Sequence, residues 1–401
     1  MRELAKIGLW NIVRRKKRAL LTVLGIFIGI AAVVALVSIG QGLQQSVQDQ
    51  FSKVGGDKIL VQAKEFGVGG VAAAGKLGVR ELDVIQHVIG VGEAAGGLAL
   101  SGKTRFNDVQ RTVFVAMLPV KSSEANLLTT FTTWEADKGR LLRSGERGKV
   151  VIGATLSSGN VFLKDISLRN TIVVNDVGFD VVGILTRTGD PTTDSSVILS
   201  EPDARAVLNS SDVYSYIVAQ AVGDPDVVSH RVERALRRDR HQKEGNEDFS
   251  VQTSTELIAS FNTVLNIIQV IFVGIAAISL LVGGVGIMNT MFTAVLERTR
   301  EIGVMKAIGA TNSSILFVFM LESGILGLLG GVAGVLVGAG IGMLVEQVVN
   351  YAYGAGTIHA VFPVWLVIGA VLFAGVIGIL SGLLPALRAS RLSPVEALRE
   401  E

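Results

Sequence analysis

The sequence contains no cysteine, only seven prolines and 6% aromatic residues. The absence of cysteine excludes disulfide bonds and thiolate metal sites, so any domain must be stabilised by its own apolar core. The four histidines form no pair at metal-ligand spacing, and no GxSxG nucleophile motif occurs. These absences argue against an enzyme that carries out covalent chemistry.

Charged residues are missing from long stretches of the chain. Four apolar runs reach the length of about 20 residues that a bilayer span requires. The runs are Ala19–Ile39 and segments within Thr263–Leu296, Ala307–Val345 and Ala360–Leu387. The first run is too long for the core of a signal peptide, so we expect an uncleaved anchor. The second and third exceed a hydrocarbon core of about 30 Å and should tilt or project beyond it.

Lysine and arginine are concentrated at particular ends of these runs. Seven precede the first span, three lie between the second and third, three follow the fourth, and Gln347–Pro363 has none. Because positively charged loops stay in the cytoplasm, we expect both termini and residues 297–311 to be cytoplasmic. Residues 41–262 should then lie outside, and Met1–Val13 should form an amphipathic segment on the inner leaflet of the plasma (inner) membrane.

The extracytoplasmic segment is predicted to be α+β, because short runs rich in β-branched and aromatic residues alternate with stretches of helical periodicity. The expected helices are Glu81–Ile89, Ala204–Leu208 and Asp226–Arg238. The expected strands are Lys58–Gln62, Arg111–Met117, Val150–Ile152, Thr171–Val174, Phe179–Leu185, Val197–Leu199, Tyr214–Gln220 and Phe249–Gln252.

The sequence therefore predicts a multi-domain membrane protein with four transmembrane α-helices and a large α+β extracytoplasmic domain inserted between the first and second spans. The expected extracytoplasmic parts are a helical stalk (41–53 and 253–263), an α+β domain (54–119 and 213–252), an inserted lobe (120–212) and a loop (347–363). The expected membrane and cytoplasmic parts are an N-terminal segment (1–18), spans 19–40, 264–296, 312–346 and 364–387, a coupling loop (297–311) and a tail (388–401).

One stretch, Gly286–Thr311, changes abruptly from an apolar helix to a charged, amphipathic segment between two spans. It breaks at Gly309, and Thr311 and Asn312 can cap the next helix. Such a segment should lie at the lipid–water boundary, where it can present charges to a soluble partner. Its charged residues are Glu297, Arg298, Arg300, Glu301 and Lys306. From the residues alone, a docking element and an ordinary polar loop with two helix caps both remain open.

Two features inside the spans point to helix packing. Glycines at four-residue spacing leave a side-chain-free groove for a neighbouring helix. They are Gly25 and Gly29 in the first span and Gly330, Gly334, Gly338 and Gly342 in the third. Glu322 is the only charged residue in its apolar run, where an ionised carboxylate costs about 2.5–3.5 kcal/mol. Structural hydrogen bonding between helices and a role in switching are both open for it.

Two other patterns invite a function that we do not assign. Gly97–Thr104 fits the phosphate-loop pattern GxxxxGK[ST], but the residues after Thr104 have no helical periodicity, so no helix N-terminus would face a phosphate. The basic helix between Arg231 and Lys243 is interpreted as a solvated face, with a contact patch for an acidic partner or lipid headgroups as the alternative.

Several segments closely resemble the macrolide-exporter (MacB-type) and FtsX-like family of ABC permeases. They are the loop sequences ERTREIG (297–303) and IGA (308–310), LTVLGI (21–26) in the first span, FDVVG (179–183) in the inserted lobe, and PVEALR (394–399) in the tail. Glu322 also lies in a glutamate-containing pattern similar to that of the family.

The resemblance implies a homodimeric permease that works with two copies of a separate cytoplasmic ABC ATPase. ATP and magnesium would bind that partner, and this chain would need no cofactor of its own. The five charged loop residues would then dock the ATPase, and its closure would move the extracytoplasmic domain to handle a drug, peptide or lipid-like substrate. Membrane lipid and a periplasmic adaptor are further expected partners, and nucleic acid is not.

Two other functions stay open at this stage. An FtsX-like regulator would use the same motion to activate an extracytoplasmic partner such as a cell-wall hydrolase. A stand-alone adhesion or receptor protein would leave the charge pattern of the loop without a purpose.

Overall fold

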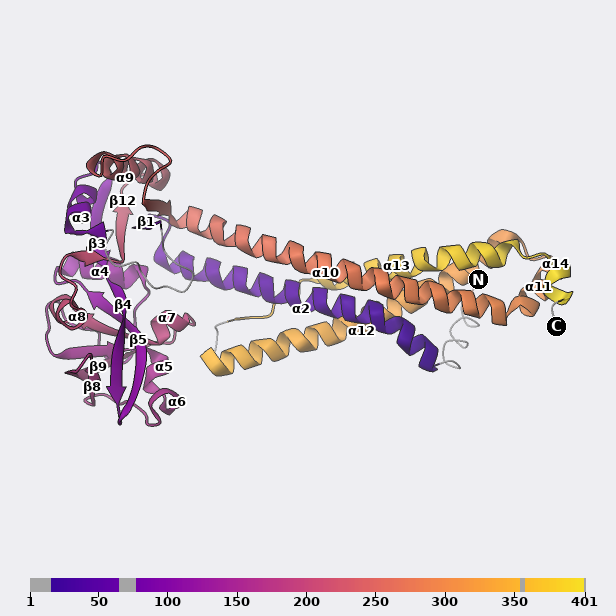
Figure 1. Cartoon of the computed structure of the whole chain (residues 1–401), viewed down its shortest axis with the longest axis horizontal. Coiled ribbons are helices and arrows are strands. Elements are labelled where there is room, and N and C mark those ends of the chain that lie inside the picture. Colours follow the sequence, from indigo (N-terminus) through magenta and orange to yellow (C-terminus); the bar gives the residue numbers. More distant parts are fainter. Residues whose placement is uncertain (1–15, 65–76, 354–357, 400–401) are drawn as a thin grey trace. The chain divides into compact units, whose positions relative to one another are not determined.

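The computed structural model describes residues 16–64, 77–353 and 358–399. They belong to two compact units (Figure 1), which are treated separately below. The helical unit comprises Met1–Leu43, Val264–Val348 and His359–Glu401, and the mixed unit comprises Gln44–Thr263 and Val349–Ile358. The predicted amphipathic segment Met1–Val13 lies outside the described residues.

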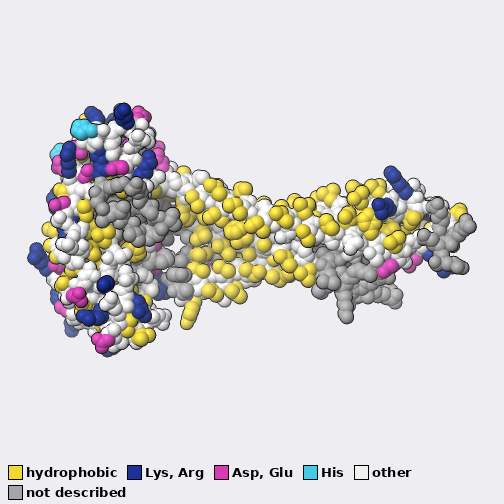
Figure 2. Space-filling model, in the orientation of Figure 1, with side chains coloured by type: hydrophobic (Ala, Val, Ile, Leu, Met, Phe, Trp, Pro, Cys, Tyr) yellow, Lys and Arg dark blue, Asp and Glu magenta, His cyan; other side chains and the backbone are white. Residues whose placement is uncertain are grey.

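Four long helices dominate the helical unit. They are α2 (Lys16–Val54), α10 (Ser254–Glu297), α12 (Asn312–Tyr353) and α13 (Val364–Arg391). Within the described residues, these four are the helices long and apolar enough to cross a membrane. Hydrophobic side chains cover much of the visible face of this unit in Figure 2, as expected for a surface in contact with lipid. The prediction of four spans is confirmed.

The helices α2 and α10 approach each other at glycine. A Cβ atom added to Gly25 would lie 2.6 Å from the Cα of Gly283, and one added to Gly29 would lie 3.2 Å from the side chain of Leu280. A larger side chain at Gly25 would require a backbone shift, and one at Gly29 would require the Leu280 side chain to move. Small residues permit this distance because nothing projects between the two backbones.

The glycines of α12 also lie at helix contacts. A Cβ on Gly334 would lie 2.8 Å from Ile30, and one on Gly338 would lie 2.6 Å from the carbonyl oxygen of Ala31, both in α2. Gly342 faces Phe362 at 3.2 Å, and Gly330 is buried. The packing role assigned to these positions stays a prediction, and the short distances support it.

The mixed unit contains a four-stranded antiparallel sheet of order β13-β1-β12-β3. Its strands are β1 (Lys58–Ala63), β3 (Val91–Gly97), β12 (Tyr216–Ala221) and β13 (Phe249–Thr253). Alternate residues point to opposite faces. Ile59 and Ile217 pack with helices α3 (Val79–Gln86) and α9 (Pro225–Asp239), whereas Val218 packs with α4 (Ser122–Phe131).

The second sheet of this unit closes into a ring. Its order is β6-β9-β7-β10-β5-β4-β8, and β8 also pairs with β9. The strands are β4 (Ala99–Phe106), β5 (Val109–Leu118), β6 (Ala136–Gly139), β7 (Lys149–Ile152), β8 (Thr171–Val174), β9 (Val177–Leu185) and β10 (Ser196–Ser200). Six strands therefore form a small closed barrel with β6 added beside β9. Closure removes exposed strand edges.

Short elements complete the chain. The remaining strands are β2 (Leu77–Gly78) and β11 (Val213–Tyr214), which pair with each other. The remaining helices of the described residues are α5 (Ala154–Ser157), α6 (Gly159–Phe162), α7 (Pro191–Asp194), α8 (Glu201–Leu208), α11 (Thr299–Ala307) and α14 (Pro394–Arg399).

The boundary expected at residues 119–120 differs from the sheet assignment. Residues 99–118 fall within the α+β domain expected at 54–119 and 213–252, but β4 and β5 belong to the barrel. The reason is a parallel pairing in which Val115 of β5 lies opposite Val197 of β10, a long-range contact that no local pattern reveals. Asn107 and Asp108, with φ of 50° and 59°, form the two-residue turn of the β4–β5 hairpin.

The same topology removes the phosphate-loop interpretation of Gly97–Thr104. These residues end β3 and form most of β4, and Thr104 pairs with Arg111 and Val174 in the barrel. A strand, and not a helix N-terminus, follows the glycines.

The packing of α12 can be tested with two glycines that are two residues apart. Gly338→Leu should destabilise the protein by about 1–3 kcal/mol, because the new side chain has no space against α2. Gly340→Leu makes the same chemical change where nothing lies within 4 Å of an added Cβ. Thermal unfolding in detergent compares the two variants, and equal melting temperatures would contradict the packing role.

Candidate functional site

The segment between α10 and α12 forms a short separate helix. Arg298, with φ −113° and ψ 15°, leaves helical geometry and divides α10 from α11. Gly309, with φ 100°, ends the segment, because glycine adopts this left-handed conformation without strain. The Thr311 hydroxyl then accepts a hydrogen bond from the backbone N–H of Ser314 at 3.2 Å and caps α12, as the sequence predicted.

One face of α11 is fixed within the helical unit by apolar contacts. Ile302 is fully buried in a cluster with Ile315 of α12 and with Ala386 and Ala389 of α13. Helix α14 also packs against α11, and its Ala397 is buried. The short helix is therefore joined by the chain to α10 and α12, and it also packs with α13.

Arg298 also points inward. Its guanidinium donates to the Glu322 carboxylate at 3.1 Å, and the two side chains are only 19% and 9% exposed. The pair supplies an ionic partner for the one charge in the apolar run of α12. This supports the interpretation of Glu322 as a link between helices.

Lys306 is engaged at the other end of α11. Its ammonium group donates to the backbone carbonyl oxygens of Ser390 and Leu392, each at 2.7 Å. These residues form the C-terminal end of α13, where carbonyl groups lack helical partners and the helix dipole favours a cation. No sequence pattern indicates this contact, because the partners are backbone atoms more than eighty residues away.

The opposite face of α11 is exposed. It carries Arg300, Glu301, Val304 and Ile308, and the last two are 48% and 81% exposed. Arg300, Val304 and Ile308 are four residues apart and therefore lie on one side of a helix. We call these four residues the docking face. Mixed charged and apolar exposure of this kind is typical of a protein contact surface.

The five charged residues predicted to dock a partner are thus divided by the structure. Arg300 and Glu301 lie on the docking face, and Glu297 is exposed at the end of α10. Arg298 and Lys306 are instead turned toward α12 and α13. A further contact missed from the sequence is that of Arg388 in α13, whose guanidinium lies 4.8 Å from the ring centre of Phe292 in α10.

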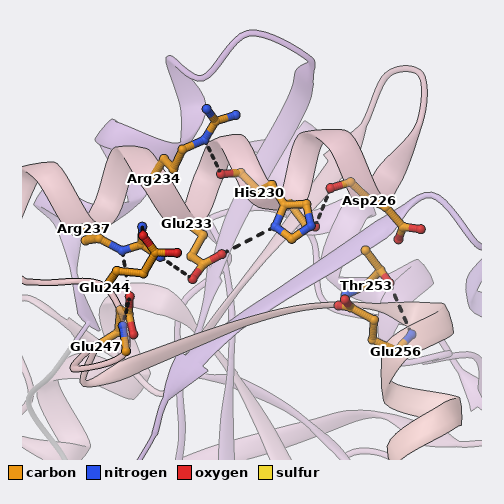
Figure 3. Close-up of polar contacts among 11 residues, drawn as sticks. Asp226, His230, Glu233, Arg234, Arg237, Glu244, Glu247, Thr253 and Glu256 are labelled. Carbon is orange, nitrogen blue, oxygen red and sulfur yellow. Dashed lines mark hydrogen bonds and ion pairs between the residues drawn. The ribbon is translucent and has the colours of Figure 1, made fainter.

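In the mixed unit, arginines of the basic helix α9 and the turn after it have internal partners, and Figure 3 shows those of Arg234 and Arg237. Arg237 contacts Glu233 and Glu247, each at 2.7 Å, and Arg240 contacts Asp248 at 2.6 Å. The Glu247 carboxylate accepts hydrogen bonds from its own backbone N–H, from that of Gly245 and from Arg237. These bonds lower its pKa, so that it stays ionised. These pairings weaken the alternative of a free basic patch.

A polar cavity of about 480 Å³ lies beside these residues and is lined by parts of α9, β13 and the start of α10. The described residues contain no group of three or more His, Asp or Glu side chains placed to hold a metal ion.

Comparisons with known proteins agree with this architecture. The family model of the FtsX-like permease C-terminal domain matches residues 273–394, and that of the MacB-like periplasmic core domain matches residues 19–235. The chain is 33% identical to an uncharacterized ABC transporter permease of Methanocaldococcus jannaschii, over 98% of this chain and 96% of that protein. It is 31% identical to the uncharacterized ABC transporter permease YknZ of Bacillus subtilis, over 99% and 98%.

The macrolide export ATP-binding/permease protein MacB of Bdellovibrio bacteriovorus is 30% identical over 98% of this chain, which spans 61% of that protein. The fold and the site thus define a multi-pass membrane protein with a MacB-like α+β domain between its first two spans. The chain belongs to the MacB/FtsX-like family of ABC transporter permeases.

The Arg298–Glu322 pair can be tested by a double-mutant cycle. Arg298→Met and Glu322→Met should each destabilise the protein by about 3–5 kcal/mol, because each leaves a buried charge without its partner. The double variant should recover much of that loss. Unfolding in detergent gives the coupling free energy, and additive effects of the two substitutions would show that the pair does not link the helices.

Proposed function

We propose that this chain is the permease subunit of an ATP-driven transporter of the MacB type. A cytoplasmic ABC ATPase binds the docking face, and the motion that follows ATP binding passes through the spans to the mixed unit. The mixed unit lies outside the membrane and moves a drug, peptide or lipid-like substrate. ATP and magnesium bind the ATPase, and two copies of this chain work together, with a periplasmic adaptor as a further partner.

One observation carries this proposal: α11 exposes a charged and apolar face while its other face is attached to several membrane helices. Apolar contacts join it to α12 and α13, and the chain joins it directly to α10. A partner that pushes the exposed face would therefore load three spans at once. A loose polar loop would yield under the same push.

The distribution of basic residues supports the proposed orientation. Arg300 and Arg391 are exposed near the ends of α10 and α13, and positively charged flanks stay in the cytoplasm. Both termini and α11 then lie inside the cell with the ATPase.

The MacB-like periplasmic core match supports an exporter over a regulator. An FtsX-like regulator would use the same docking face and would move an extracytoplasmic enzyme instead of a substrate. Stimulation of the ATPase by an added drug, peptide or lipid separates the two functions, because a regulator would respond to its protein partner alone.

The docking face is tested by reversing its two charges. The double variant Arg300→Glu, Glu301→Arg should weaken co-purification of the ATPase by about tenfold or more, equivalent to about 1.4 kcal/mol. Like charges would then face each other across the contact. Stability should change by less than about 1 kcal/mol, because both side chains are exposed.

A matched control exchanges Asp137 and Lys138, two exposed residues of opposite charge in β6 of the mixed unit. This exchange should leave ATPase binding unchanged. If the Arg300/Glu301 variant bound the ATPase as well as the wild type does, α11 would not be the docking element.

A further inference from the structure

Helix α13, like α2, is a long helix of the helical unit that the chain does not join directly to α11. The chain runs from α10 through α11 into α12, whereas α13 begins more than fifty residues after α11 ends. A motion of α11 therefore reaches α10 and α12 through covalent bonds. It reaches α13 only through non-covalent contacts.

The polar contact that makes this connection is that of Lys306. Its ammonium group contacts two carbonyl oxygens at the end of α13, each at 2.7 Å. An ammonium group at a helix C-terminus is favoured both by hydrogen bonding and by the helix dipole. The two acceptors belong to the last residue but one of α13 and to its C-cap, so the lysine holds the helix by its end.

The ionic contact of Arg298 completes the arrangement at the start of α11. Arg298 precedes the helix and contacts Glu322 in α12, whereas Lys306 lies in the last turn and contacts α13. The two cations thus attach opposite ends of α11 to two different spans. The apolar contacts of Ile302 lie between them.

We infer that Lys306 is a positioning residue that makes α13 move together with α11, so that a push on the docking face displaces α13 as well as α10 and α12. This inference rests on the proposed function, and it assigns Lys306 to transmission within the chain instead of to contact with the ATPase. Loss of the lysine should free α13 from α11 without weakening ATPase binding.

The absence of cysteine makes a distance measurement straightforward, because introduced cysteines are the only labelling sites. Spin labels at Ala307 and Leu384, both exposed and outside the docking face, report the separation of α11 and α13. The labelled chain is measured in nanodiscs alone and then with the ATPase bound to a non-hydrolysable ATP analogue. In the otherwise wild-type chain the distance distribution should be narrow and should stay the same when the nucleotide-bound ATPase is added.

Lys306→Met should broaden this distribution in the chain alone and should shift it when the ATPase binds. Lys306→Arg keeps donors at the same place and should restore the narrow distribution, which also shows that the site tolerates substitution. Arg391→Met, which removes an exposed cation at the end of α13, is the matched control and should behave as wild type.

A narrow, unchanged distribution in Lys306→Met would overturn the inference. Failure of the proposed function looks different, because the wild-type chain would then bind no ATPase at all. In that case the measurement on the chain alone still decides whether Lys306 holds α13 to α11.

Discussion

The attachment of a nine-residue helix to the ends of long spans is the constraint on which the rest of this account depends. A helix this short is marginal on its own, because nucleation is costly and few backbone hydrogen bonds follow. Here Ile302 is buried against α12 and α13, and charged groups are attached at each end. One side of the segment is therefore packed into the helical unit, and its other side is exposed.

Much of this architecture could be predicted from the sequence, because the signals are local. The four spans follow from long apolar runs, and the separate α11 follows from the charges after Leu296 and from Gly309. Thr311 caps α12 as expected. The family resemblance likewise depends on short local motifs, and the comparisons confirm it over nearly the whole chain.

What could not be predicted depends on contacts between distant residues. The parallel pairing of β5 with β10 moves residues 99–118 into the barrel, although their own pattern fits either sheet. The sequence predicts Lys306 as a docking residue because its charge can be identified from the sequence. The backbone carbonyl oxygens that it contacts cannot be identified in this way. Arg298 was likewise grouped with the docking residues, since its partner Glu322 lies 24 residues away.

The central claim is that α11 lies inside the cell, where an ATPase can reach it. The most direct measurement labels single introduced cysteines in right-side-out spheroplasts with a membrane-impermeant maleimide. Only the introduced cysteine reacts, because the native sequence contains no cysteine. A cysteine at Glu301 should react only after the membrane is permeabilised, whereas one at Asp137 should react at once. Labelling of residue 301 in intact spheroplasts would place α11 outside and would contradict the account.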